Sequence, residues 1–126
     1  MIERTIFGPE HGQFRDSYRR FLEREVAPHH EKWEETGRVP REVWRKAGEG
    51  GFLCVTMPEA YGGAGADRLY SAVLMEEQAD MGFSGLGFPL HSDIVAPYIL
   101  NYGSEEQKRA WLPKLISGET IGAIAM

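Results

Sequence analysis

The most distinctive part of the chain is its final segment, Tyr102-Gly-Ser-Glu-Glu-Gln-Lys-Arg-Ala-Trp-Leu-Pro-Lys-Leu-Ile-Ser-Gly-Glu-Thr-Ile-Gly-Ala-Ile-Ala-Met126. Ser104 and Gln107 have the S-x-x-Q spacing of a capping box, in which two side chains satisfy free backbone N–H groups at a helix start. We therefore expect a helical hairpin whose second helix begins at Ser104, is divided at Pro113 and ends at Gly118.

The last residues, 120–126, are rich in Ile, Ala and Met and predict the beginning of a β-strand. No other segment has the clear pattern of a partner strand. A strand without a partner leaves its backbone N–H and C=O groups without hydrogen bonds. We therefore expect the chain to be one domain of a larger protein whose other strands lie further along the sequence.

Before this segment, apolar residues recur at helical spacing between glycine and proline residues. The expected helices span about 9–26, 29–35, 40–49, 67–81, 92–102 and 104–118. The apolar run 52–57 fits a short extended segment, and Glu25, near an apolar stripe, is expected to pair with a basic residue on a neighbouring helix. Most of these helices have one apolar face. The pattern predicts an all-α fold, a small bundle of about five to six helices.

The composition is that of one globular domain, with 42% hydrophobic and 26% charged residues in a chain of 126. Its 14 basic and 19 acidic residues give a net charge of −5 without a basic cluster, which argues against a nucleic-acid partner. The single cysteine, Cys54, fits a reducing compartment. We find no signal-peptide pattern and no apolar run long enough to span a membrane. We expect a cytoplasmic protein without a membrane span.

Histidine and cysteine spacing gives no indication of a metal site. The residues three positions before the four histidines are Gly8, Val26, Ala27 and Phe88, so no Glu-x-x-His motif is present. Cys54 has apolar neighbours and no nearby histidine, which predicts a small buried side chain.

Two other patterns also favour structural roles. Adjacent Glu76 and Glu77 point about 100° apart on a helix, so we expect one exposed acid and one in an ion pair. The glycine-rich run 62–65 lacks the Lys-Ser/Thr of a phosphate loop and indicates a tight turn. The residues alone therefore yield no catalytic set, which suits a domain that forms a wall of an active site completed elsewhere.

Nine short motifs follow one another in an order that one enzyme family shares. They are Val26-Ala-Pro28, Val39-Pro40 with Trp44, Gly48-Glu-Gly-Gly-Phe52, Pro58-Glu-Ala-Tyr-Gly-Gly-Ala-Gly65, Glu76-Glu77, Tyr102-Gly-Ser-Glu-Glu-Gln-Lys108, Trp111-Leu-Pro113, Gly118-Glu119 and Gly122-Ala-Ile-Ala-Met126. Over nearly its whole length the chain resembles the N-terminal domain of acyl-CoA dehydrogenases. Residues 84–95 are most similar to the long-chain branch.

The resemblance implies that residues 1–119 are the N-terminal helical domain and that 120–126 begin a flavin-binding β-domain. It implies a homo-oligomeric enzyme that binds FAD and desaturates an acyl-CoA at Cα–Cβ. A glutamate removes the α-proton, the β-hydride passes to flavin N5, and electrons leave through an electron-transfer flavoprotein. The family's glutamate lies in a C-terminal domain, so the resemblance implies no catalytic residue in this chain.

The same resemblance implies two groups of site residues. Ile124 and Met126 match positions that lie against the flavin. The positions that match the distal acyl pocket are Gly85, Leu86, Pro89 and Asp93. Glycines at 85 and 87 add no side-chain bulk and Pro89 discourages helix before it, which favours a deep pocket for long or branched chains.

Two alternatives remain open at this point. One is a stand-alone, non-catalytic helical interaction module. The other is an acyl-CoA oxidase or a flavin-dependent monooxygenase of the same architecture, because reactivity with oxygen is set around the flavin.

Overall fold

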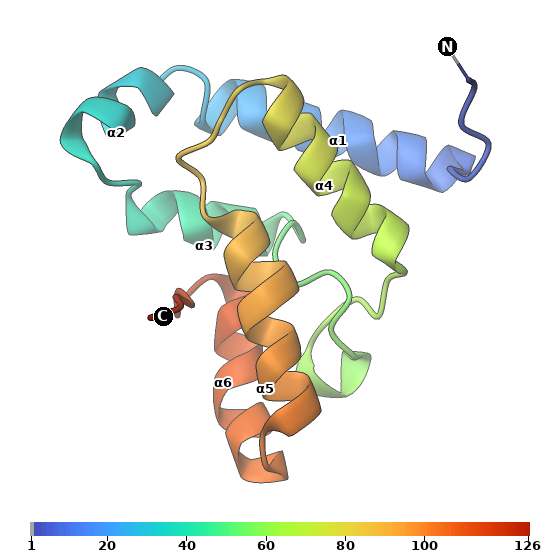
Figure 1. Cartoon of the computed structure of the whole chain (residues 1–126), viewed down its shortest axis with the longest axis vertical. Coiled ribbons are helices and arrows are strands. Elements are labelled where there is room, and N and C mark those ends of the chain that lie inside the picture. The colour runs from blue at the N-terminus through green and yellow to red at the C-terminus, as the bar shows by residue number, and fades with distance from the viewer. Residues whose placement is uncertain (1) are drawn as a thin grey trace.

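The computed structural model describes residues 2–126, which form six α-helices, a 3-10 turn and a π-helical turn (Figure 1). The α-helices are α1 (Pro9–Glu25), α2 (His30–Thr36), α3 (Arg41–Glu49), α4 (Arg68–Asp80), α5 (Ala96–Tyr102) and α6 (Glu105–Ser117). The 3-10 turn η1 spans Glu59–Tyr61, and the π turn η2 (Leu90–Val95) continues directly into α5. The predicted all-α bundle is confirmed.

The helices pack in pairs. α1 lies along α4, α5 and α6 form the expected antiparallel hairpin, and α3 packs against α6 (Figure 1). Two predicted helix starts are confirmed, because the Asp67 carboxylate accepts from the Leu69 N–H at 2.8 Å and the Ser104–Gln107 capping box is complete. No helix among residues 2–126 is both long and apolar enough to cross a membrane.

Two local expectations are wrong. Pro113 lies inside an unbroken α6, where buried Leu112 and Leu115 keep both sides of the proline in the core. Residues 52–57 form turns instead of an extended segment, because Gly51 and Cys54 adopt left-handed conformations with φ of 77° and 52°. Residues 121–126 have no partner strand within 2–126, so the expected beginning of a β-strand stays a prediction.

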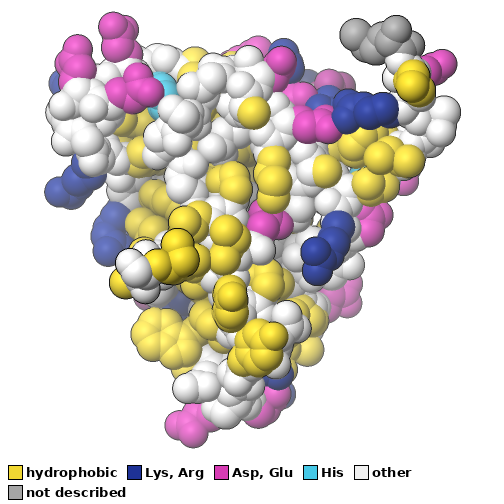
Figure 2. All heavy atoms as spheres, in the orientation of Figure 1, with side chains coloured by type: hydrophobic (Ala, Val, Ile, Leu, Met, Phe, Trp, Pro, Cys, Tyr) yellow, Lys and Arg dark blue, Asp and Glu magenta, His cyan; other side chains and the backbone are white. Residues whose placement is uncertain are grey.

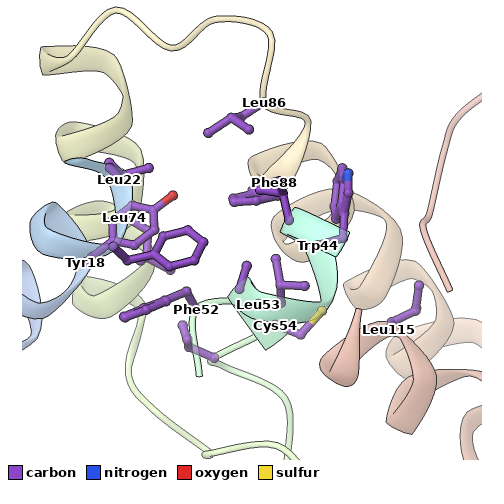
Figure 3. Close-up of a cluster of buried hydrophobic side chains, with 14 of the residues drawn as sticks. Tyr18, Leu22, Trp44, Phe52, Leu53, Cys54, Leu74, Leu86, Phe88 and Leu115 are labelled. Atoms are coloured by element: carbon purple, nitrogen blue, oxygen red, sulfur yellow. The ribbon is translucent and has the colours of Figure 1, made fainter. Parts of the chain in front are cut away.

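One continuous core joins all the layers (Figure 3). Tyr18 from α1 packs against the Phe52 ring, with ring centroids 5.0 Å apart. Trp44 from α3 makes an edge contact with Phe88 at 4.7 Å between centroids. Cys54 is 1% exposed within this core, as predicted for a small buried side chain.

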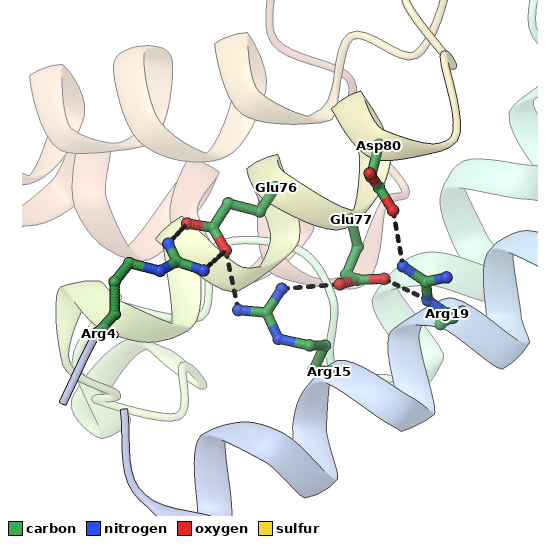
Figure 4. Close-up of polar contacts among 6 residues, drawn as sticks. All are labelled: Arg4, Arg15, Arg19, Glu76, Glu77 and Asp80. Atoms are coloured by element: carbon green, nitrogen blue, oxygen red, sulfur yellow. Dashed lines mark hydrogen bonds and ion pairs between the residues drawn. The ribbon is translucent and has the colours of Figure 1, made fainter. Parts of the chain in front are cut away.

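An ion-pair cluster fastens α1 to α4 (Figure 4). It consists of Arg4, Arg15, Arg19, Glu76, Glu77 and Asp80. The buried Glu77 carboxylate accepts from Arg15 at 2.7 Å and from Arg19 at 2.6 Å. Glu76 is the more exposed of the two acids, and it also takes part in ion pairs, with Arg4 and Arg15.

The predicted pairing of Glu25 is confirmed. Lys46 of α3 donates to its Oε2 at 2.8 Å. Like the acidic residues on α4, Glu25 joins two helices by an ion pair.

α3 and α6 are in close backbone contact at two glycines, where no side chain separates them. A Cβ at Gly48 would lie 2.2 Å from the Ser117 carbonyl oxygen, and one at Gly118 would lie 2.2 Å from the Trp44 carbonyl oxygen. Gly118 also has a φ of 76°, which other residues rarely adopt. These two contacts set where α6 ends relative to α3.

We expect Gly48→Ala to lower the melting temperature, because the added methyl group overlaps α6 backbone at a cost of about 1–3 kcal/mol. Gly12→Ala is the matched control, since nothing lies within 4 Å of a Cβ there. That change should stabilise α1 by up to about 1 kcal/mol. Thermal unfolding followed by circular dichroism distinguishes the two, and equal stability of both variants would contradict the close contact.

Candidate functional site

Two adjacent hollows lie along α4, one facing the η2–α5 segment and the other facing the loop 82–89 that leads into η2. One hollow of about 420 Å³ is lined by Thr56, Arg68, Ser71, Ala72, Met75, Asp93, Ile94 and Pro97. A second, of about 480 Å³, is lined by Met75, Gln78, Ala79, Gly82, Phe83, Ser84 and Pro89. Met75 lines both, so we call the pair the α4–η2 groove. Hydrophobic side chains gather on this face of the molecule (Figure 2).

The groove has one polar end, at Asp93. Burial raises the pKa of the Asp93 carboxyl, while a hydrogen bond from Ser71 and the charge of Arg68 act in the opposite direction. The end towards Met75, Ala79 and Pro89 is predominantly apolar. The groove therefore suits an elongated apolar ligand with a polar group near Asp93.

The π-helical turn η2 decides which side chains face this groove. Its wider turn, closed by the Ala96 N–H donating to the His91 carbonyl, leads into Pro97 in the first turn of α5. Ile94 remains 43% exposed on the groove side, while His91 and Ser92 are buried. Such π turns occur frequently at functional sites.

The four positions expected to line an acyl pocket are not all in one place. Pro89 and Asp93 line the α4–η2 groove. Leu86 is 3% exposed in the core. Gly85 lines a separate hollow of about 190 Å³ beside α2, and a Cβ there would lie 3.2 Å from His30 Nε2. Two of the four therefore share the groove.

The two positions expected at the flavin lie in the last residues. Ile121 packs on the core, and Gly122 lies against η2, where a Cβ would be 2.7 Å from Val95 Cγ1. Beyond this point Ile124 is 37% exposed and Met126 is fully exposed. Both present apolar surface to solvent at the end of the described chain.

Sequence reasoning missed the role of His91. Its ring is 0% exposed, with Nε2 2.8 Å from the Leu115 carbonyl oxygen and Nδ1 2.9 Å from the Gly122 N–H. The Gly122 N–H must donate, so Nδ1 accepts, and Nε2 carries the proton that reaches Leu115. Only the neutral imidazole makes both bonds. A lone histidine within an apolar helical pattern was the available signal.

Gln78 and Ser92 were missed as well. The Gln78 amide donates to the carbonyls of Phe83 and Leu86, at 3.1 and 2.8 Å, and so fixes the loop after α4. The Ser92 hydroxyl accepts from the Cys54 N–H at 2.9 Å and supports that left-handed turn. A glutamine on the buried face of α4 was the signal for the first of these. Within residues 2–126 no cluster of three or more His, Cys, Asp or Glu side chains is placed to hold a metal ion.

Comparison with known families decides the relationship. Residues 8–119 match the family described as acyl-CoA dehydrogenase, N-terminal domain. The chain belongs to the acyl-CoA dehydrogenase family. The resemblance found in the sequence motifs is thereby confirmed.

Similar proteins are longer than this chain. The chain is 52% identical to the long-chain specific acyl-CoA dehydrogenase, mitochondrial, of Sus scrofa, covering 98% of this chain and 29% of that protein. The crystal structure of an acyl-CoA dehydrogenase from Geobacillus kaustophilus matches with a TM-score of 0.90 and 50% identity, over 94% of this chain and 31% of that one. An acyl-CoA dehydrogenase from Bacillus anthracis, complexed with FAD, matches with a TM-score of 0.81 and 30% identity, over 95% and 21%. The chain thus spans about a third or less of these acyl-CoA dehydrogenases.

We expect acid to destabilise this domain partly through His91. Burial lowers the pKa of His91, although its bond to the Leu115 carbonyl acts in the opposite direction. The unfolded chain then binds more protons, so the free energy of unfolding falls as pH decreases below the ordinary value of about 6.5. Between about pH 7.5 and 5.5 the melting temperature should fall more in the wild type than in His91→Gln. Parallel pH profiles would show that His91 is not held neutral.

Proposed function

We propose that this chain is the N-terminal domain of an FAD-dependent acyl-CoA dehydrogenase that desaturates a long-chain acyl-CoA at Cα–Cβ. In this proposal residues 1–119 are the helical domain, and 120–126 lead into a flavin-binding β-domain. The observation that carries it is the α4–η2 groove. The turn η2 lines this groove and also contacts Gly122, which leads to Ile124 and Met126. The family match and the long-chain relative of Sus scrofa support it.

The groove supplies a binding surface for the acyl chain. Small and flexible side chains line it, with Ala72 and Ala79 leaving room on α4 and Met75 between them. Each methylene buried on such a surface contributes about 0.8 kcal/mol, so a long chain gains more than a short one. Of the four positions inferred from the resemblance, Pro89 and Asp93 are the two that we assign to this wall, while Gly85 and Leu86 contribute by shaping the loop before it.

Residues 122–126 fit a flavin on two counts. Ile124 and Met126 offer exposed apolar surface, and the backbone groups of 123–126 have no hydrogen-bond partner within residues 2–126. A flat ring with polar edges can use both features. Bound FAD would accept a hydride from the substrate, while residues of this chain would hold the ring and exclude water. The base that removes the α-proton is assigned to residues outside this chain.

The partners follow from the same proposal. They are an acyl-CoA substrate, an electron-transfer flavoprotein as electron acceptor, and further copies of the protein in a homo-oligomer. Location in the cytoplasm stays a prediction from the sequence, while the name of the Sus scrofa relative includes the word mitochondrial.

The test uses the protein expressed from its complete reading frame. We expect a yellow protein that contains FAD and oxidises palmitoyl-CoA with a dye or an electron-transfer flavoprotein as acceptor. The 126-residue chain alone should be inactive and bind FAD weakly, because it lacks most of the flavin site. Hydrogen peroxide as the main product would favour an oxidase. A colourless protein without acyl-CoA oxidation would favour the non-catalytic interaction module.

A second measurement tests the groove itself. In the complete protein, Pro89→Glu places a charge on the apolar part of the groove and should lower kcat/KM for palmitoyl-CoA at least about tenfold more than for butyryl-CoA. Lys114→Glu, on the exposed side of α6, is the control and should leave the chain-length preference unchanged. Equal losses for both substrates in Pro89→Glu would contradict the assignment.

A further inference from the structure

The segment after α6 is held at three successive points. The backbone of Gly118 lies against Trp44 of α3, and the Thr120 N–H donates to the Lys114 carbonyl at 3.1 Å. The third point is the Gly122 N–H, which donates to His91 Nδ1 at 2.9 Å. Within residues 2–126 no later N–H has a hydrogen-bond acceptor. Gly122 is therefore the last anchored residue before Ile124 and Met126.

His91 is itself fixed from several sides. Its Nε2 donates to Leu115 of α6, and its ring makes an edge contact with Trp44 of α3, with centroids 5.1 Å apart. Its exposed fraction is 0%. An acceptor held this rigidly defines the position of its donor more narrowly than a surface side chain or water would.

Gly122 fits closely against the same turn. A Cβ there would lie 2.7 Å from Val95 Cγ1, so its backbone touches η2 directly. The other side of η2 carries Asp93 and Ile94, which line the α4–η2 groove. A single helical turn thus sets the position of the groove wall and of the terminal segment.

We propose that His91 is a positioning residue, whose Nδ1 lone pair holds Gly122 so that Ile124 and Met126 meet the flavin at a fixed place beside the groove. This inference rests on the proposed function. The Nδ1 lone pair holds Gly122, whereas Nε2 serves only to orient the imidazole.

Two substitutions distinguish the roles of the two ring nitrogens of His91. In His91→Asn, the amide oxygen occupies a position close to that of Nδ1 and keeps an acceptor for Gly122. In His91→Gln, the amide nitrogen occupies a position close to that of Nε2 and keeps only the donor to Leu115. Both variants remove the ring from beside Trp44, so each is the matched control for the other.

Amide hydrogen exchange of the 126-residue chain measures the anchor without any flavin. We expect exchange at Gly122 to be about tenfold faster in His91→Gln than in the wild type, and within about threefold of the wild type in His91→Asn. Equal exchange at Gly122 in the two variants would overturn the proposal. Should both variants unfold, the wild-type chain still decides, because the proposal requires Gly122 to exchange at least about tenfold more slowly than Ala123.

The complete protein then links the anchor to the flavin. We expect the Kd for FAD, measured by flavin fluorescence, to be about tenfold higher in His91→Gln than in His91→Asn. Equal FAD affinity in the two variants would contradict the positioning role while leaving the proposed function intact. A wild-type protein that binds no FAD would instead refute the proposed function, whatever the exchange at Gly122.

Discussion

The neutral imidazole of His91 is the constraint on which the arrangement of the site depends. Its two hydrogen bonds join η2 to the end of α6 and to the segment that follows. A charged ring would turn Nδ1 into a donor facing the Gly122 N–H, and the site would lose its acceptor there. Burial lowers the pKa of the ring and so favours its neutral form, and Trp44 of α3 makes an edge contact with it. The packing of α3 and the position of the last residues are therefore parts of one arrangement.

Two different kinds of contact join the pairs of helices around His91. α3 and α6 approach through glycine backbone at Gly48 and Gly118, where side chains would not fit. α1 and α4 are joined instead by arginines and carboxylates, of which Glu77 is buried. Neither kind of contact uses the outer face of α4 and η2, where the polar contacts are those of Asp93 with Ser71 and Arg68. That face forms the α4–η2 groove. Its exposed side chains Met75 and Ile94 lie outside the core cluster and remain available for an apolar ligand.

The sequence predicted those features that depend on local chemistry. Capping at Ser104 and the pairing of Glu25 follow from side chains with one obvious structural use. The effect of Pro113 is not predictable in this way, because it depends on how firmly the buried neighbours Leu112 and Leu115 hold the helix. The groove was less predictable: the family resemblance indicated Pro89 and Asp93, which line it, while His91 bonds backbone groups 24 and 31 residues away and Gln78 bonds two carbonyls of the following loop. No spacing rule shows which carbonyl or N–H a buried polar side chain will meet.

The most direct test of the role of His91 is to determine which ring nitrogen carries the proton and whether Nδ1 is bonded to Gly122. Nitrogen-15 NMR of the wild-type chain should show the Nε2-protonated neutral tautomer and a scalar coupling between His91 Nδ1 and the Gly122 amide nitrogen. That coupling exists only when the N–H···N hydrogen bond is formed. A ring protonated at Nδ1, or a neutral ring without the coupling, would contradict the claim that His91 fixes the path of residues 122–126.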